Sequence, residues 1–219
     1  MDKLLETFKI VDGIAPFLEF HNERLNYARQ VLFNAHDKID LKNFIQAPSQ
    51  SGIYRCRVIY SKTIETVEYF PYQNRKFQTF KIVENDNIAY EFKYLNREHL
   101  NRLVTFKGQA DEILIIKKGF VTDTSIANVA FWHIDKWLTP STPLLKGTTR
   151  ARLLKENKIV EAEIRLEDLK HFSKIAIMNA LIGFYLVEDF GTRKYSLKNS
   201  FAPNVFARPS TSSGNEKLL

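Results

Sequence analysis

The spacing of apolar and polar residues changes from strand-like to helical early in the chain. Residues 4–10 are predicted to form a strand that ends at the turn-forming pair Asp12-Gly13, and residues 16–20 a second short strand. Asn22 is a good helix N-cap, and apolar residues recur at helical spacing over residues 22–34, which predicts an amphipathic helix. A further short helix is predicted over residues 41–45.

The next segments predict strands that continue this first unit. Residues 53–61, 64–72 and 77–83 are rich in β-branched and aromatic residues and are typical of an antiparallel meander. The polar, turn-prone residues 84–87 then mark a predicted domain boundary. Residues 1–84 are therefore expected to form a small N-terminal α+β domain.

The second half is predicted to be strand-rich, with short helices inserted, and residues 85–199 are expected to form a larger C-terminal domain. Residues 200–219 contain prolines and a Ser/Thr/Gly run that cannot bury enough apolar surface to offset their ordering entropy, which predicts a disordered tail. The predicted fold class is α+β, in two domains. The expected strands are residues 89–93, 111–117, 129–133, 137–138 and 174–180, and the expected helices are residues 97–106 and 148–156.

Composition narrows the class of protein. The 219 residues are 44% hydrophobic and carry a net charge of +7, but acidic residues are interspersed with the basic ones, which favours a solvated basic surface over a nucleic-acid interface. Cys56 is the single cysteine, so no intrachain disulfide can form and a reducing compartment is expected. With no signal peptide and no run of roughly 18 apolar residues, the chain is expected to be cytoplasmic, with no membrane partner. The histidines show no metal-ligand spacing, so no metal is expected.

Three segments carry most of the residues with distinctive chemistry. They are residues 92–97 (FKYLNR), 119–128 (GFVTDTSIAN) and 139–150 (TPSTPLLKGTTR). Upstream stand Glu6-Thr7 and the run HNERL at residues 21–25, and downstream stands Met178-Asn179-Ala180. In this order, the motifs resemble those of the class IV aminotransferase family, over about residues 4–182.

The resemblance implies pyridoxal 5'-phosphate as cofactor, in a cleft between a small N-terminal and a larger C-terminal domain, and a homodimer that acts on a small amino compound. It identifies Lys93 as the lysine that holds the cofactor as a Schiff base and moves the substrate proton. On its own, Lys93 reads as a surface lysine, as most lysines are. Asp123 stands where the family usually has glutamate, the partner of the pyridine nitrogen. Without the resemblance, Asp123 is a turn aspartate.

Other residues are assigned to the phosphate and to the substrate. A guanidinium suits bidentate contact with phosphate, and a helix that begins after glycine presents backbone N–H groups to an anion. Met178 departs from the family's threonine, so no hydroxyl contact is expected there. The alternative readings are a solvated helix charge, a glycine that ends a loop, and arginines on a solvent-facing strand. The cofactor-binding residues implied by the resemblance are Arg24, Gly147, Thr148, Thr149 and Asn179, and the substrate-binding residues are Arg57 and Arg55.

The resemblance leaves three activities open. The surroundings of Lys93, Lys-x-Leu-Asn-Arg, are more similar to aminodeoxychorismate lyases, which release pyruvate and 4-aminobenzoate, a folate precursor, than to branched-chain aminotransferases. A class IV aminotransferase acting on small amino acids is the alternative. A degenerate member without turnover is a third hypothesis, motivated by Asp123 and Met178.

Overall fold

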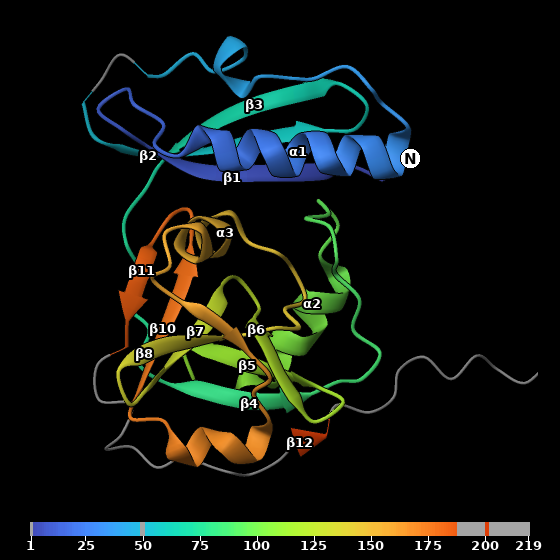
Figure 1. The fold of residues 1–219 in the computed structure, drawn as a ribbon. Coiled ribbons are helices and arrows are strands. Elements are labelled where there is room, and N and C mark those ends of the chain that lie inside the picture. The colour runs from blue at the N-terminus through green and yellow to red at the C-terminus, as the bar shows by residue number, and fades with distance from the viewer. Residues whose placement is uncertain (1, 49–50, 188–199, 202–219) are drawn as a thin grey trace, which may run out of the picture.

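A three-stranded antiparallel sheet with one long helix forms the N-terminal unit of the structure, a computed structural model that describes residues 2–48, 51–187 and 200–201 (Figure 1). The sheet order is β1-β2-β3. Side chains alternate along β2 between buried and partly exposed positions, so one face packs on α1 and forms the core. The elements are β1 (Leu4–Val11), α1 (Leu18–Phe33), the 3-10 turn η1 (Leu41–Asn43), β2 (Ile53–Tyr60) and β3 (Ile64–Pro71).

A larger sheet forms the C-terminal unit, and residues 72–79 connect the two (Figure 1). Within the described residues its order is β11-β10-β7-β6-β5-β4-β12, and β8 pairs with β7 and β9. The strands are β4 (Phe80–Glu84), β5 (Glu112–Lys117), β6 (Phe120–Thr124), β7 (Asn128–His133), β8 (Lys136–Pro140), β9 (Val160–Ala162), β10 (Lys174–Asn179), β11 (Gly183–Leu186) and β12 (Ser200–Phe201). The helical elements are α2 (Glu98–Val104), η2 (Thr105–Lys107), α3 (Thr148–Lys155) and η3 (Leu166–His171).

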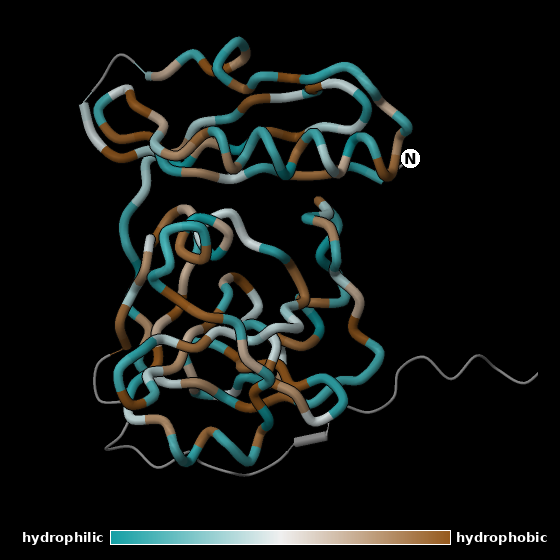
Figure 2. Tube along the Cα trace, viewed as in Figure 1, coloured by the Kyte–Doolittle hydropathy of each residue, from teal (hydrophilic) through white to brown (hydrophobic). Residues whose placement is uncertain are grey.

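The core of the larger unit is made by its central strands. Their hydrophobic stretches are visible in brown in Figure 2. Leu114, Ile116, Val129, Phe131 and Ile177 are fully buried in one cluster. Near-continuous apolar strands of this kind are expected where both faces of a sheet are covered.

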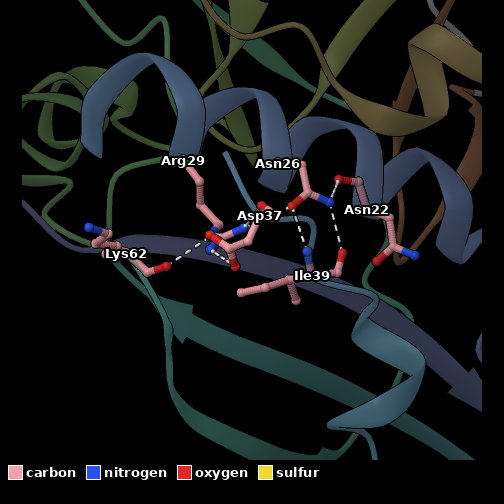
Figure 3. Close-up of polar contacts among 6 residues, drawn as sticks. All are labelled: Asn22, Asn26, Arg29, Asp37, Ile39 and Lys62. Atoms are coloured by element: carbon pink, nitrogen blue, oxygen red, sulfur yellow. Dashed lines mark hydrogen bonds and ion pairs between the residues drawn. The ribbon is translucent and has the colours of Figure 1, made fainter. Parts of the chain in front are cut away.

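A network of hydrogen bonds fastens the chain after α1 back onto that helix (Figure 3). The buried Arg29 donates to Asp37 Oδ2 at 2.8 Å and to the Lys62 carbonyl at 2.8 Å. The Asn26 amide donates to the carbonyl of Ile39 at 2.8 Å. Arg29 is only 1% exposed, so this network stabilises the N-terminal unit.

The structure bears out most of the predicted elements and corrects three. Residues 16–20 do not form a strand, because α1 already begins at Leu18 after Phe17 adopts a left-handed conformation. Residues 89–93 form no strand either, and only Tyr94 bridges to Leu4. The third strand of the predicted meander is wrong, because β4 pairs in parallel with β5 in the larger sheet. The strands β6, β9, β11 and β12 were not predicted, and β12 falls at the start of the segment expected to be a disordered tail.

The predicted domain boundary and the predicted C-terminal tail both stay predictions. The domain boundary at residue 84 stays a prediction, and the membership of β4 in the larger sheet favours an earlier boundary, within residues 72–79. The predicted tail, residues 200–219, lies outside the described residues except for Ser200–Phe201. In the described part of the chain, no helix is long and apolar enough to cross a membrane.

Candidate functional site

A cavity of about 430 Å³ lies between the two units and collects most of the predicted site residues. Its wall is made by β1, α1, β2, the segment before α2, the β6–β7 turn, the start of α3 and the end of β10. Thr149 is buried behind the wall rather than on it. The predicted residues that line the cavity are Arg24, Arg55, Arg57, Lys93, Asp123, Gly147, Thr148 and Asn179.

Lys93 is held in the cavity wall by its neighbours in sequence. Phe92 and Tyr94 both pack against the core of the N-terminal unit, and the backbone N–H of Leu5 donates to the Lys93 carbonyl at 2.9 Å. Burial, reinforced by the positive charge of Arg24, lowers the pKa of Lys93 to about 7. A large fraction of the amine is therefore neutral at pH 7, which is the form that attacks a carbonyl carbon.

Asp123 is the penultimate residue of β6 and lies inside the protein, 4% exposed. Its Oδ1 accepts from Asn128 Nδ2 at 2.7 Å, and its Oδ2 accepts from the Leu145 backbone N–H at 2.9 Å. Burial raises the pKa of Asp123 to about 7, because these neutral donors do not compensate for the loss of water. Among the described residues, no cationic side chain forms an ion pair with this carboxyl group. A ligand that brings a protonated nitrogen would satisfy it.

Arg24 belongs to a buried cluster that sequence reasoning did not foresee. Its Nε and Nη2 donate to Glu6 Oε1 and Oε2 at 2.8 and 2.6 Å, and His21 Nδ1 lies 2.6 Å from Glu6 Oε2. Burial alone would raise the pKa of Glu6, but Arg24 and His21 together lower it to about 2. Glu6 occupies two of the five guanidinium N–H donors, so three remain for an anion in the cavity.

The neutral form of His21 connects this cluster to α3. Burial lowers the pKa of His21, and the Glu6 carboxylate requires the proton on Nδ1. The Nε2 atom is then the acceptor, and it lies 3.3 Å from Thr148 Oγ1 in the first turn of α3. One hydrogen bond therefore joins the N-terminal unit to the C-terminal unit beside the cavity.

The start of α3 is suited to an anion. The first N–H groups of a helix have no partner within the helix, and the helix dipole favours negative charge there. Gly147, the N-cap residue, makes no side-chain cap and lines the cavity together with Thr148. A Cβ on Gly147 would lie 2.0 Å from Asn128 Oδ1, so the backbone is close-packed at this point. Taken together, the cavity offers an amine nucleophile, a carboxyl group that forms no ion pair with a described residue, and two groups suited to an anion, the Arg24 guanidinium and the start of α3.

The model of the family described as amino-transferase class IV matches residues 3–189. The chain belongs to the class IV aminotransferase family. The family that the sequence motifs indicated is thereby confirmed, and so is the predicted fold class of mixed helices and strands.

Relatives of this class IV aminotransferase family member cover most of the chain. An uncharacterized protein of Haemophilus influenzae is 40% identical over 187 residues, which are 84% of this chain and all of that protein. A crystal structure from Haemophilus somnus, provisionally named a 4-amino-4-deoxychorismate lyase, is 37% identical, with a TM-score of 0.76 over 82% of this chain and 96% of the other. The pyridoxal-phosphate-bound form of a hypothetical aminotransferase from Mycobacterium tuberculosis is 18% identical, with a TM-score of 0.70 over 85% and 80% of the two chains, and shares the fold.

The two predicted substrate arginines of this family member differ in their surroundings. Arg57 pairs with Glu68 at 3.0 Å. Arg55 lies over the ring of Phe70, 4.9 Å from its centroid, and its buried Nε has no hydrogen-bond partner among the described residues. Both line the cavity, and Arg55 has a buried Nε donor that no described residue accepts.

Asn179 lines the cavity and makes hydrogen bonds within the protein. Its amide donates to the Ile126 carbonyl at 3.2 Å, and its Oδ1 accepts from the backbone N–H groups of Leu181 and Ile182. Asn179 thus shapes the turn that forms one wall of the cavity. A contact with a phosphate stays a prediction.

Several residues of the site were missed. Glu6, His21 and Asn128 stand inside the motifs, but their roles come from contacts between elements that the motifs do not specify. Arg97, which donates to the Ser125 carbonyl at 2.5 Å and lines the cavity, was visible only as part of the lysine motif. Arg75, also on the wall, had no signal in the sequence. Within the described residues, no cluster of three or more His, Cys, Asp and Glu side chains is placed to hold a metal ion.

Proposed function

We propose that this family member is a cytoplasmic, homodimeric enzyme that uses pyridoxal 5'-phosphate, held covalently by Lys93, to convert aminodeoxychorismate into 4-aminobenzoate and pyruvate. The observation that carries the proposal is a cavity lined both by an amine with a pKa of about 7 and by a buried carboxyl group that forms no ion pair with any described residue. Strongly displaced pKa values of this kind are typical of functional sites.

The residues present fit this cofactor. Lys93 Nζ would hold its aldehyde carbon, Asp123 its ring nitrogen, and Arg24 with the start of α3 its phosphate. Asp123 is suited to a protonated ring because its carboxyl group has two neutral donors and no cation. When bound, pyridoxal phosphate supplies an electrophilic carbon and a ring that accepts an electron pair.

The protein's own groups would then handle protons and orientation. Lys93 Nζ, with its pKa near 7, can remove a proton at the carbon next to the substrate nitrogen and return it elsewhere. The free donors of Arg55 and the partly exposed Arg57 would bind a substrate carboxylate. In the lyase reaction the carbon–oxygen bond to the pyruvate-forming group breaks, and no other reactant is needed.

The lyase is preferred over two alternatives. Support comes from the similarity to the Haemophilus somnus structure and from the sequence Lys-x-Leu-Asn-Arg around Lys93. An aminotransferase that acts on small amino acids would use the same cavity. Two solved structures of similar fold are named as aminotransferases. A non-catalytic member would keep the fold without turnover.

One experiment separates the three activities. The purified protein, loaded with pyridoxal phosphate, is incubated with aminodeoxychorismate while pyruvate is measured. Formation of pyruvate and 4-aminobenzoate supports the lyase. Turnover of glutamate and a keto acid without pyruvate would replace it by an aminotransferase, and neither activity, at full cofactor loading, would leave the non-catalytic member.

Attachment of the cofactor is tested separately. Borohydride reduction followed by peptide mapping should find the cofactor on Lys93 in the wild type and on no peptide of Lys93→Ala. Lys158→Ala, which removes a surface lysine paired with Glu156, is the matched control and should be labelled like the wild type.

A further inference from the structure

Asn128, at the first position of β7, makes two hydrogen bonds with one amide group. Its Nδ2 donates to Asp123 Oδ1 at 2.7 Å and to the Leu145 carbonyl at 2.7 Å, which uses both protons of the amide. Asn128 is only 5% exposed, so water does not replace either bond. Its amide therefore connects Asp123 to the segment that precedes α3.

The same segment returns to Asp123 from the other side. The Leu145 backbone N–H donates to Asp123 Oδ2 at 2.9 Å. Asp123, Asn128 and Leu145 thus form a closed set of three hydrogen bonds that joins β6, β7 and the segment before α3. Both oxygens of the carboxyl group are fixed in direction by groups that carry no charge.

Gly147 completes this arrangement by leaving room. A Cβ at this position would lie 2.0 Å from Asn128 Oδ1 and 3.2 Å from its Cγ. The backbone of Gly147, with φ −71° and ψ 147°, is one that any residue adopts, so backbone conformation does not require glycine. The close approach of the Asn128 amide does require it.

We propose that Asn128 is a positioning residue for Asp123, and that position 147 is glycine in order to seat the Asn128 amide. Gly147 then acts on Asp123 through the Asn128 amide, which it contacts and which donates one hydrogen bond to Asp123, in addition to any contact with an anion. The part that concerns the ring nitrogen rests on the proposed function. The coupling between positions 128 and 147 does not.

A double-mutant cycle tests the coupling. Wild type, Asn128→Ala, Gly147→Ala and the double variant are titrated with pyridoxal phosphate, and the visible absorption band is followed against pH. Each single variant should bind the cofactor about ten-fold more weakly, the size expected when a buried hydrogen-bonding group is left unmatched. Because alanine at 128 removes the clash, the double variant should bind within about two-fold of Asn128→Ala.

The absorption band distinguishes positioning from mere stability. Loss of the Asn128 donor should raise the pKa of Asp123 further, so the pH dependence of the band should shift in Asn128→Ala. The matched control is Asn26→Ala. The Asn26 amide likewise donates two hydrogen bonds, in this case to the backbone carbonyls of Asn22 and Ile39 (Figure 3). Asn26→Ala should lower the melting temperature but leave the band and the affinity unchanged.

Two results would overturn the proposal. Equal, additive effects of Gly147→Ala in both backgrounds would mean that glycine serves only an anion there. An unchanged pH dependence of the band in Asn128→Ala would mean that Asn128 does not position Asp123. If Asn128→Ala does not fold, Asn128→Ser, which keeps one donor, replaces it and should give a smaller shift in the same direction.

Failure of the proposed function can be told apart from failure of this inference. If even the wild type takes up no pyridoxal phosphate, the proposed cofactor is wrong. The melting temperatures of the four apoproteins still report the coupling, since Gly147→Ala should lower the value in wild type and not in Asn128→Ala. The pH dependence of apoprotein stability still reports Asp123.

Discussion

Two buried carboxyl groups line or adjoin the same cavity and are treated in opposite ways by the protein. Glu6, in the N-terminal unit, is fully buried but receives a bidentate Arg24 and the ring of His21, and its pKa falls to about 2. Asp123, in the C-terminal unit, is almost as buried, but its hydrogen-bond donors are neutral and Arg150 acts on it only at a distance. Burial therefore prevails and its pKa rises to about 7. Burial acts alike on both, so the presence of a cation decides the direction.

Under the proposed function, this difference separates a carboxylate that stabilises the fold from one that binds the cofactor. The charge of Glu6 is balanced by Arg24 inside the chain. Removing either member of this ion pair leaves the other as an uncompensated buried charge. The charge of Asp123 is left for something else to balance, and the amine of Lys93 nearby is likewise displaced toward neutrality. Under the proposed function, folding alone balances the charge of Glu6, whereas the charge of Asp123 is balanced only when the cofactor binds.

The largest effect is expected when the cavity loses its proposed nucleophile, Lys93. Lys93→Ala should lower turnover by at least about 10³-fold, because it removes both the covalent anchor and a proton-transfer group. Steady-state pyruvate release and cofactor retention after gel filtration measure it. Retention and turnover that both survive unchanged would contradict the assignment of Lys93.

A pair of isosteric substitutions tests the comparison directly. Asp123→Asn should lower turnover about 10²-fold. It should cost no more than about 1 kcal/mol of apoprotein stability, because it removes an unbalanced buried charge but turns an amide N–H toward the donor of Asn128 or Leu145. Glu6→Gln should instead destabilise the protein by about 3 kcal/mol, because it leaves Arg24 buried without its anion. Urea unfolding and turnover, measured on both variants, check the contrast. If the two variants lose the same stability, the distinction between the two carboxyl groups fails.

The pH dependence of apoprotein stability should show the same contrast. The folded-state pKa of Asp123 lies above its ordinary value of 3.8, so its contribution to stability is lost as pH rises from about 4 to 7. The folded-state pKa of Lys93 lies below its ordinary 10.5, so stability returns as pH rises from about 7 to 10. The wild type should therefore be less stable near pH 7 than on either side, by about 2–4 kcal/mol.

Glu6 should act in a different range. Its folded-state pKa lies below 4.5, so its stabilisation is present at neutral pH and is lost as pH falls from about 4.5 toward 2. Urea unfolding from pH 3 to 10 measures these slopes. Asp123→Asn should flatten the slope between pH 4 and 7 and leave the acid slope in place. A slope that persists in that variant would assign it to another group.

The sequence was sufficient for the parts that depend on local pattern and short motifs. Periodicity predicts the helices α1, α2 and α3 and the apolar strands β5, β7 and β10. The motifs predicted that Lys93, Asp123 and Gly147 belong to one site, and all three line the same cavity. The parts that failed depend on tertiary partners. The strand β4 has the composition of a meander strand, but its place is set by pairing with β5. The tripartite set of Glu6, His21 and Arg24 joins residues 15 to 18 positions apart, and no local pattern encodes it.

The smallest effect is expected at the side-chain hydrogen bond between His21 and Thr148, which connects the two regions. Thr148→Val removes the hydroxyl that faces His21 Nε2 at 3.3 Å while keeping the shape of the side chain. Because this bond is long, its loss should cost about 0.5–1 kcal/mol, and Thr148→Ser should restore most of it. Thr139→Val, which removes an equally buried hydroxyl that bonds the Val129 carbonyl within the C-terminal unit, is the control. Both valine variants should lower the melting temperature, but only Thr148→Val should change the pH dependence near the titration of His21, because only that hydroxyl contacts the imidazole.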